Sequence, residues 1–239
     1  MRSFLVLCWL TIPFLAWAYH VGPGQQKMKL DEAGSLLRQA SFAVDSADFE
    51  NAKALYSQAL AKLPEDHKAD SYAIRLAMAK AQTESNQLPE ARAALESLLE
   101  EMENDSAADP ALLDQTRDAL ANAQYYMTWL MRLEGKPAEN WEPEIEASRQ
   151  HYRLLAEKAA KAGDSQSLET RQHDLEASIR LARMDLAELQ SLKIPSQCKG
   201  CCSGQCKKPN QKPSQKKNKS EQKNGTGANM GPLPDGSGS

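Results

Sequence analysis

The chain has 239 residues, of which 26% are charged and 6% aromatic, and its formal net charge is −3. Residues 19–194 hold 20 basic and 30 acidic side chains, a net charge of −10, whereas residues 195–239 hold eight lysines against Glu221 and Asp235, a net charge of +6. An acidic body favours solubility and argues against nucleic acid binding by the folded part.

The N-terminal segment has the features of an export signal. Arg2 precedes an apolar run from Phe4 to Ala16, and Ala16-Trp17-Ala18 has the small-x-small pattern that signal peptidase accepts. We therefore expect residues 1–18 to be a cleaved signal peptide and the protein to be periplasmic, envelope-associated or extracellular. The alternative is an N-terminal membrane anchor, although a span needs about 20 apolar residues and this run is shorter.

The region that follows predicts a flexible lead-in over residues 19–29 and an all-α body over residues 30–194. The body is rich in Ala, Leu, Glu, Gln, Lys and Arg, which are strong helix formers. Few alternating runs of Val, Ile or Thr occur there, so a sheet has little material. We expect six or seven helices joined by short connections.

Caps and breakers predict several helix boundaries. Asp109 is placed to cap a helix whose first-turn residue is Pro110, and Pro143 is expected in the same first-turn role. Gly163 suits a left-handed helix end, with Asp164 or Ser165 capping the next helix.

Residues 46–64 carry a repeat motif of small, aromatic, small and proline positions. Its residues are Ser46, Ala47, Asp48, Phe49 and Glu50, then Ala52, Tyr56, Ala59 and Pro64. The alanines let two helices approach, the aromatic residue fills the gap between successive helix pairs, and the proline ends the helix. This stretch resembles the second half of a tetratricopeptide repeat (TPR).

Further copies of the motif are weaker. Residues 88–98 keep the spacing with Ala91, Leu95 and Leu98, and residues 120–126 resemble the first helix of a third copy. Ala52 and Ala91 are 39 residues apart, whereas the family's period is about 34, so one connection or helix is expected to be longer than usual. The resemblance implies TPR-like helical repeats over residues 30–134, with a concave face for a protein partner. An irregular helical bundle is the alternative.

Residues 135–194 predict a long antiparallel helical hairpin that turns at Gly163. Its second helix has a four-three seam of apolar residues, and the preceding helix has a similar stripe. The seam consists of Leu168, Leu175, Ile179, Ala182, Leu186 and Leu189.

Candidate chemistry in the helical body is sparse. The aromatic stripe of Tyr125, Tyr126 and Trp129 is interpreted as core packing. The four histidines lie in no metal-ligand spacing, and the Glu144 and Glu146 carboxylates are interpreted as a solvated helix face. We therefore predict that the protein is not an enzyme.

The C-terminal region, residues 195–239, begins with four cysteines within nine residues: Cys198, Cys201, Cys202 and Cys206. Local disulfides are the preferred interpretation for an exported protein. A metal site holding zinc, copper(I) or an iron–sulfur cluster is the alternative, although the spacing matches no common ligand pattern. No other cofactor is expected, and we expect the cluster to be thermodynamically uncoupled from the helical body.

The remainder of this region is lysine-rich and contains Met230 and Leu233 as its only large apolar residues beyond Lys207, which predicts a disordered tail. Its lysines are candidates for contact with an anionic envelope polymer or a membrane surface. Taken together, the sequence predicts an exported, non-catalytic scaffold or adaptor that binds a protein partner. A metal-handling or thiol-redox protein that acts through the cysteines is the alternative.

Overall fold

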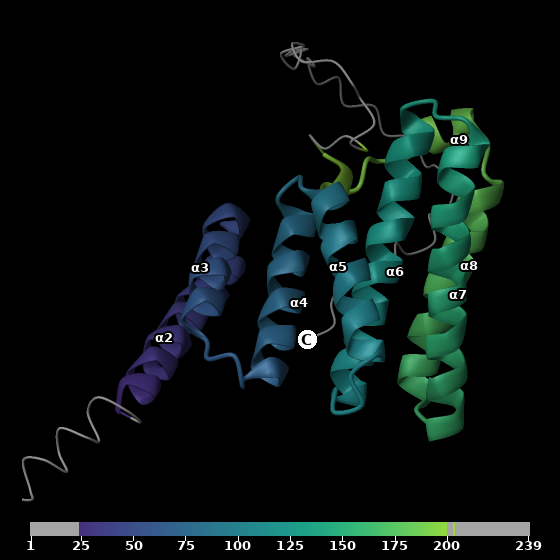
Figure 1. Cartoon of the computed structure of the whole chain (residues 1–239). Coiled ribbons are helices and arrows are strands. Elements are labelled where there is room, and N and C mark those ends of the chain that lie inside the picture. The colour runs from purple at the N-terminus through teal and green to yellow at the C-terminus, as the bar shows by residue number, and fades with distance from the viewer. Residues whose placement is uncertain (1–23, 200–202, 204–239) are drawn as a thin grey trace, which may run out of the picture.

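The computed structural model describes residues 24–199 and 203, and all regular structure in those residues is helical (Figure 1). In chain order the elements are α2 (Gln25–Asp45), α3 (Phe49–Lys62), α4 (Lys68–Glu84), α5 (Leu88–Glu103), α6 (Pro110–Leu133), α7 (Ala138–Ala162), α8 (Ser165–Arg183), α9 (Leu186–Ser191) and the 3-10 helix η2 (Ser196–Cys198).

From α2 to α8, each helix packs against the next one along the chain, in a row of helical hairpins (Figure 1). The pairs are α2 with α3, α4 with α5, and α6 with α7, and α8 then packs on α7. Helix α4 also contacts α6, so the first helices of the second and third pairs lie side by side. The predicted all-α array of helical hairpins is therefore confirmed.

Four of the hairpins turn in the same way. Ala47, Asn86, Gly135 and Gly163 all have positive φ angles, of 57°, 62°, 69° and 72° respectively. In each turn the next residue donates its backbone N–H to the carbonyl five positions earlier, as in Asp48 to Ala43 (2.8 Å) and Gln87 to Gln82 (3.1 Å). Ala47 and Asn86 are 39 residues apart, which is the spacing predicted for the first two copies of the repeat.

Ala47 is exposed and holds a left-handed conformation that a side chain disfavours. We expect Ala47→Gly to raise the free energy of unfolding by about 1 kcal/mol, because glycine adopts this conformation without steric cost. Ala54→Gly, at an exposed position inside α3, is the matched control and should lower it by about 0.5–1 kcal/mol. Urea unfolding of the two variants measures both, and a destabilised Ala47→Gly protein would contradict the turn assignment.

The predicted caps are largely confirmed. The Asp109 carboxylate accepts from the Ala111 N–H at 3.2 Å at the start of α6, and Asp164 accepts from Ser167 at 3.0 Å at the start of α8. Helix α3 ends before Pro64, because the preceding Leu63 is extended. Pro143, however, lies inside α7 rather than in its first turn, since that helix already begins at Ala138.

The predicted lead-in over residues 19–29 also needs correction. Helix α2 begins at Gln25, five residues before the expected start of the body, because Gln25, Lys27, Met28 and Lys29 are all good helix formers. The signal peptide predicted for residues 1–18 lies outside the described residues.

Three clusters of buried side chains hold the array together. One joins α2, α3 and α4 through Ala40, Ala43, Ala52, Tyr56, Ile74 and Ala81. A small one packs α7 on α6 through Ala121, Tyr152 and Leu155. The largest spans α4 to α8 and reaches α9 and η2. It contains the aromatic stripe, in which the Tyr125 ring meets Tyr126 edge-on at 5.3 Å and Trp129 at 6.2 Å. The interpretation of that stripe as core is confirmed.

The C-terminal hairpin of α7 and α8 forms as predicted, but its last helix is shorter than expected. Helix α8 ends at Arg183, and α9 begins anew with the Asp185 carboxylate accepting from Glu188 at 2.7 Å. The buried Arg132 of α6 donates to the carbonyls of Leu181 and Met184, which satisfies the end of α8. Its guanidinium also lies 4.8 Å from the centre of the Trp141 ring.

The apolar seam predicted for this helix is wrong in register along α8, whereas its last residue, Leu189 in α9, is buried as expected. Helix α8 buries Asp174, Ser178 and Leu181, whereas Leu168, Leu175, Ile179 and Ala182 are half-buried and Leu186 is 43% exposed. The reason is a polar contact: Arg171 pairs with Asp118 of α6 and with Asp174. These charges turn the polar side of α8 toward α6 and α7.

Candidate interaction groove

A hollow of about 290 Å³ lies where the first hairpin meets α4 and α6. We call it the groove. Its lining comes from four helices: Val44 of α2; Phe49 and Tyr56 of α3; Ala77, Lys80, Ala81, Thr83 and Glu84 of α4; and Asp118, Ala119 and Asn122 of α6. It therefore spans all three helix pairs of the repeat region.

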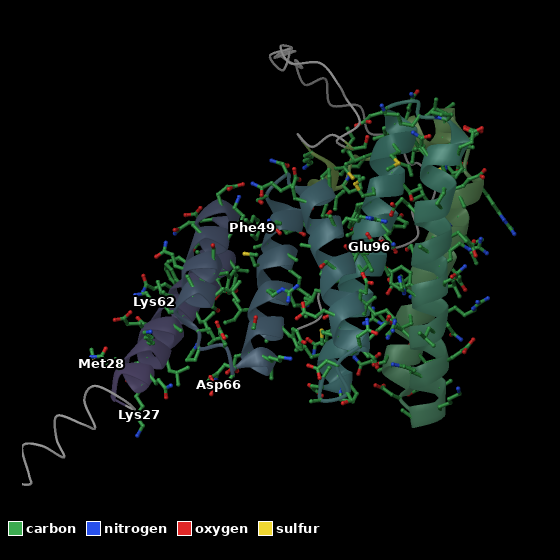
Figure 2. The ribbon with its side chains drawn as sticks, in the orientation of Figure 1. Lys27, Met28, Phe49, Lys62, Asp66 and Glu96 are labelled. Carbon is green, nitrogen blue, oxygen red and sulfur yellow. The ribbon has the colours of Figure 1, made fainter. Side chains whose placement is uncertain are left out.

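The groove has an apolar floor that follows from the repeat motif. Tyr56 is 9% exposed and belongs to the cluster that joins the first pair to α4, as predicted for the aromatic position of the motif. Phe49 is half-buried at the start of α3 and lies on the side facing α4 (Figure 2). Small side chains at Ala77, Ala81 and Ala119 leave the space between these rings and α6 open.

Charged groups border the same hollow. Lys80 and Glu84 lie one turn apart on α4, and Asp118 faces them from α6. Burial raises the pKa of the Asp118 carboxyl, while Arg171 and Lys80 act in the opposite direction. Since Arg171 also holds Asp174, this ion-pair network connects the groove to the C-terminal hairpin.

The segment after α9 contacts one of the residues that line the groove, Glu84. We call residues 195–199 together with Ser203 the strap. Gln197 donates to the Glu84 carboxylate at 2.7 Å, and the Cys198 thiol lies 3.8 Å from the Tyr126 carbonyl. Ser203 donates to both carboxylate oxygens of Glu134, through its N–H at 2.8 Å and its hydroxyl at 2.6 Å.

This packing corrects one expectation about the cysteine cluster. Cys198 is 4% exposed and belongs to the largest core cluster, and Pro195 is also buried. The first cysteine is therefore part of the folded body instead of being uncoupled from it. Pro195 fixes an extended approach that delivers Cys198 to α6, a contact that the local polar composition did not reveal.

The predicted metal or disulfide site at Cys198, Cys201, Cys202 and Cys206 stays a prediction. The last three of these cysteines lie outside the described residues. Within residues 24–199 and 203, no group of three or more His, Cys, Asp or Glu side chains has an arrangement that suits a metal ion. The choice between disulfides and metal thus depends on atoms beyond this part of the chain.

Outside the groove, His67 and Glu144 have structural partners. His67 pairs with Asp70 at 2.8 Å, and burial lowers the pKa of His151. Glu144, interpreted from the sequence as solvated, has a side chain only 14% exposed and pairs with Arg92 of α5 at 2.9 Å. Such ion pairs between neighbouring helices act as positioning contacts of the array.

A larger hollow, of about 530 Å³, lies beside Trp141 on α7. All of its lining residues except Ala182 come from α7, so it is an open flank of one helix and is not framed by the repeats. The groove is the better candidate for a binding site, because a ligand there would touch α2, α3, α4 and α6 at once. The sequence predicted Tyr56 as a packing residue between helix pairs but missed the polar residues of the groove, which lie on α4 and α6 without any motif.

Comparison with known proteins gives one match. The family model for the tetratricopeptide repeat matches residues 43–125, from the end of α2 into the middle of α6. No curated protein and no solved structure matches the chain. None of the described helices is long and apolar enough to cross a membrane.

Proposed function

We propose that this protein, whose residues 43–125 are tetratricopeptide-repeat-like, is an exported and non-catalytic scaffold that holds a protein partner in the groove. Tetratricopeptide arrays stack helix pairs into extended surfaces that bind other proteins. The single observation that carries the proposal is a groove framed by the three helix pairs that the repeat motif builds.

The make-up of the groove supports a segment of polypeptide as the ligand. Apolar side chains of a bound segment would cover Phe49 and Tyr56, while the Asn122 amide and the Lys80 and Glu84 charges offer polar partners for its backbone and charged groups. This set of groups suits non-covalent binding of a ligand and not the making or breaking of covalent bonds. Asp118, one of the two acidic residues that line the groove, is already committed to Arg171.

A pair of matched variants tests the groove. Ala77 lines the groove on α4, and Ala73 lies one turn earlier on the same helix and is exposed. Ala77→Arg places a large charged side chain in the apolar floor and should abolish partner capture, whereas Ala73→Arg should leave it intact. The measurement is affinity capture from the envelope fraction with mass spectrometry, on variants whose helicity and melting temperature have been checked. Capture of the same partners by both variants would contradict the proposal.

Export is the second part of the proposal, and it is supported by the charged start, the short apolar run and Ala16-Trp17-Ala18. We expect N-terminal sequencing of the protein from its native cells to begin at Tyr19, because cleavage should follow Ala18. An Ala18→Arg variant should block cleavage and retain the precursor, with Tyr19→Ser as the control that still matures. A membrane-bound product that begins at Met1 would contradict cleavage and favour the anchor.

A further inference from the structure

We propose that the C-terminal segment of this chain, residues 204–239, folds back into the groove and occupies it until a partner displaces it. The inference rests on the proposed function of the groove and adds its regulation. It makes the segment an intramolecular competitor for the partner's site. The support comes from where the segment starts, from charge and from its few apolar residues.

The strap fixes the start of the segment to the helices that frame the groove, α4 and α6. Gln197 is bonded to Glu84, which lines the groove, and Ser203 is fixed by two hydrogen bonds to Glu134 near the end of α6. The strap is itself packed against the helical body, since Pro195, Cys198 and Ser203 are buried. The 36 residues that follow thus start at the C-terminal end of α6, the helix that carries Asp118, Ala119 and Asn122 of the groove.

The charges of the two surfaces are opposite. Residues 207–223 contain seven lysines and one acidic residue, Glu221. In and beside the groove are the carboxylates of Asp45, Glu84 and Asp118 against the cation Lys80, while Arg171 is shared between Asp118 and the buried Asp174. The C-terminal ends of α2 and α4, whose dipoles also favour cations, lie at the same place.

The apolar residues of the segment fit the remaining part of the groove. Beyond Lys207, Met230 and Leu233 are its only large apolar side chains, and Pro232 and Pro234 flank Leu233. Prolines favour an extended backbone, which presents neighbouring side chains to a surface at low entropic cost. We assign Met230 and Leu233 to the floor made by Phe49 and Tyr56.

Length does not prevent this contact. Thirty residues separate Ser203 from Leu233. Thirty residues reach at most about 100 Å, well beyond the length of about 36 Å expected for the 24-residue α6. Tethering at this distance gives an effective concentration on the order of millimolar, so even a weak segment would fill the groove.

Photo-crosslinking in the full chain tests the inference. A photoreactive benzoyl-phenylalanine replaces Leu233, the protein is irradiated at two concentrations, and the linked peptides are identified by mass spectrometry. We expect links within one molecule to residues 44–56, 77–84 and 118–122, falling by about ten-fold with Ala77→Arg but not with Ala73→Arg. Links spread over the whole exposed surface, links between molecules, or a yield insensitive to Ala77→Arg would overturn the inference.

A second variant avoids any change in the folded body. Met230→Asp with Leu233→Asp should raise hydrogen exchange in residues 77–84 and strengthen partner capture, whereas Ser237→Asp with Ser239→Asp should do neither. Unchanged exchange would overturn the inference. The two proposals can fail independently of each other. If Ala77→Arg abolishes partner capture but Leu233 forms no links to the groove, the proposed function stands and the occupation of the groove by the C-terminal segment is contradicted. Groove links with capture indifferent to Ala77→Arg would remove the proposed function.

Discussion

Replacing Tyr56 with alanine is expected to lower the free energy of unfolding by about 3 kcal/mol. The ring is 9% exposed and lies among Ala40, Ala43, Ile74 and Ala81, so it joins the first helix pair to α4. Its removal leaves a cavity that these neighbours cannot fill, since they are anchored on two separate helices, α2 and α4. Urea unfolding followed by circular dichroism measures the loss.

The companion test is overpacking at the same joint. Ala52 is fully buried on α3, and Ala52→Leu should cost about 2 kcal/mol because the added methyl groups must push α2 away from α3. Ala54→Leu, at an exposed position of the same helix, should be nearly neutral. If Tyr56→Ala and Ala52→Leu both unfolded like the native protein, the helix pair would not be packed through this motif.

The repeat region could be predicted from the sequence because the residues of the motif are the residues that pack the helices together. Small residues at Ala52 and Ala91 mark where helices approach closely, and both are fully buried. Turn chemistry was readable as well, since Gly163 and Asp164 have local roles that need no knowledge of distant helices. Local sequence patterns were therefore enough to predict the helices and their order along the chain.

The C-terminal hairpin shows why the rest was not predictable. Apolar spacing placed the seam on Leu175 and Ile179, but α8 buries Asp174 and Ser178 one position earlier. The face of α8 that is buried is determined by the ion pair between Arg171 and Asp118, which are 53 residues apart in the sequence. The periodicity of apolar residues does not predict an ion pair whose partner comes from a distant part of the chain.

The same reasoning applies to the polar part of the groove and to the strap. Lys80, Glu84 and Asn122 belong to no motif, and they become a set only because α4 lies beside α6. Cys198 was assigned to a polar tail from its neighbours, yet its contact is the Tyr126 carbonyl, 72 residues earlier. In both cases the informative neighbours are distant in the chain.

Removing Arg171 is expected to destabilise the body by about 3 kcal/mol at pH 7. Asp174 is 3% exposed, and Asp118 faces the same guanidinium from α6, so Arg171→Met leaves two carboxylates close together without their shared cation. Restoring neutrality with Asp118→Asn in the same chain should recover part of the loss. Arg153→Met, on the exposed face of α7, is the control and should have little effect.

The pH dependence identifies the cause of that loss. Burial already raises the pKa of Asp118 above its ordinary value of 3.8, and Arg171 is the largest influence that lowers it, so Arg171→Met should raise it further. The folded variant then binds a proton more readily than the unfolded chain, and its stability falls as pH rises through the range above 3.8. The deficit relative to the native protein should therefore be smaller at pH 5 than at pH 7. Urea unfolding at both pH values measures it; a deficit that stays constant would show that Arg171 acts through packing of its side-chain carbons and not through its charge.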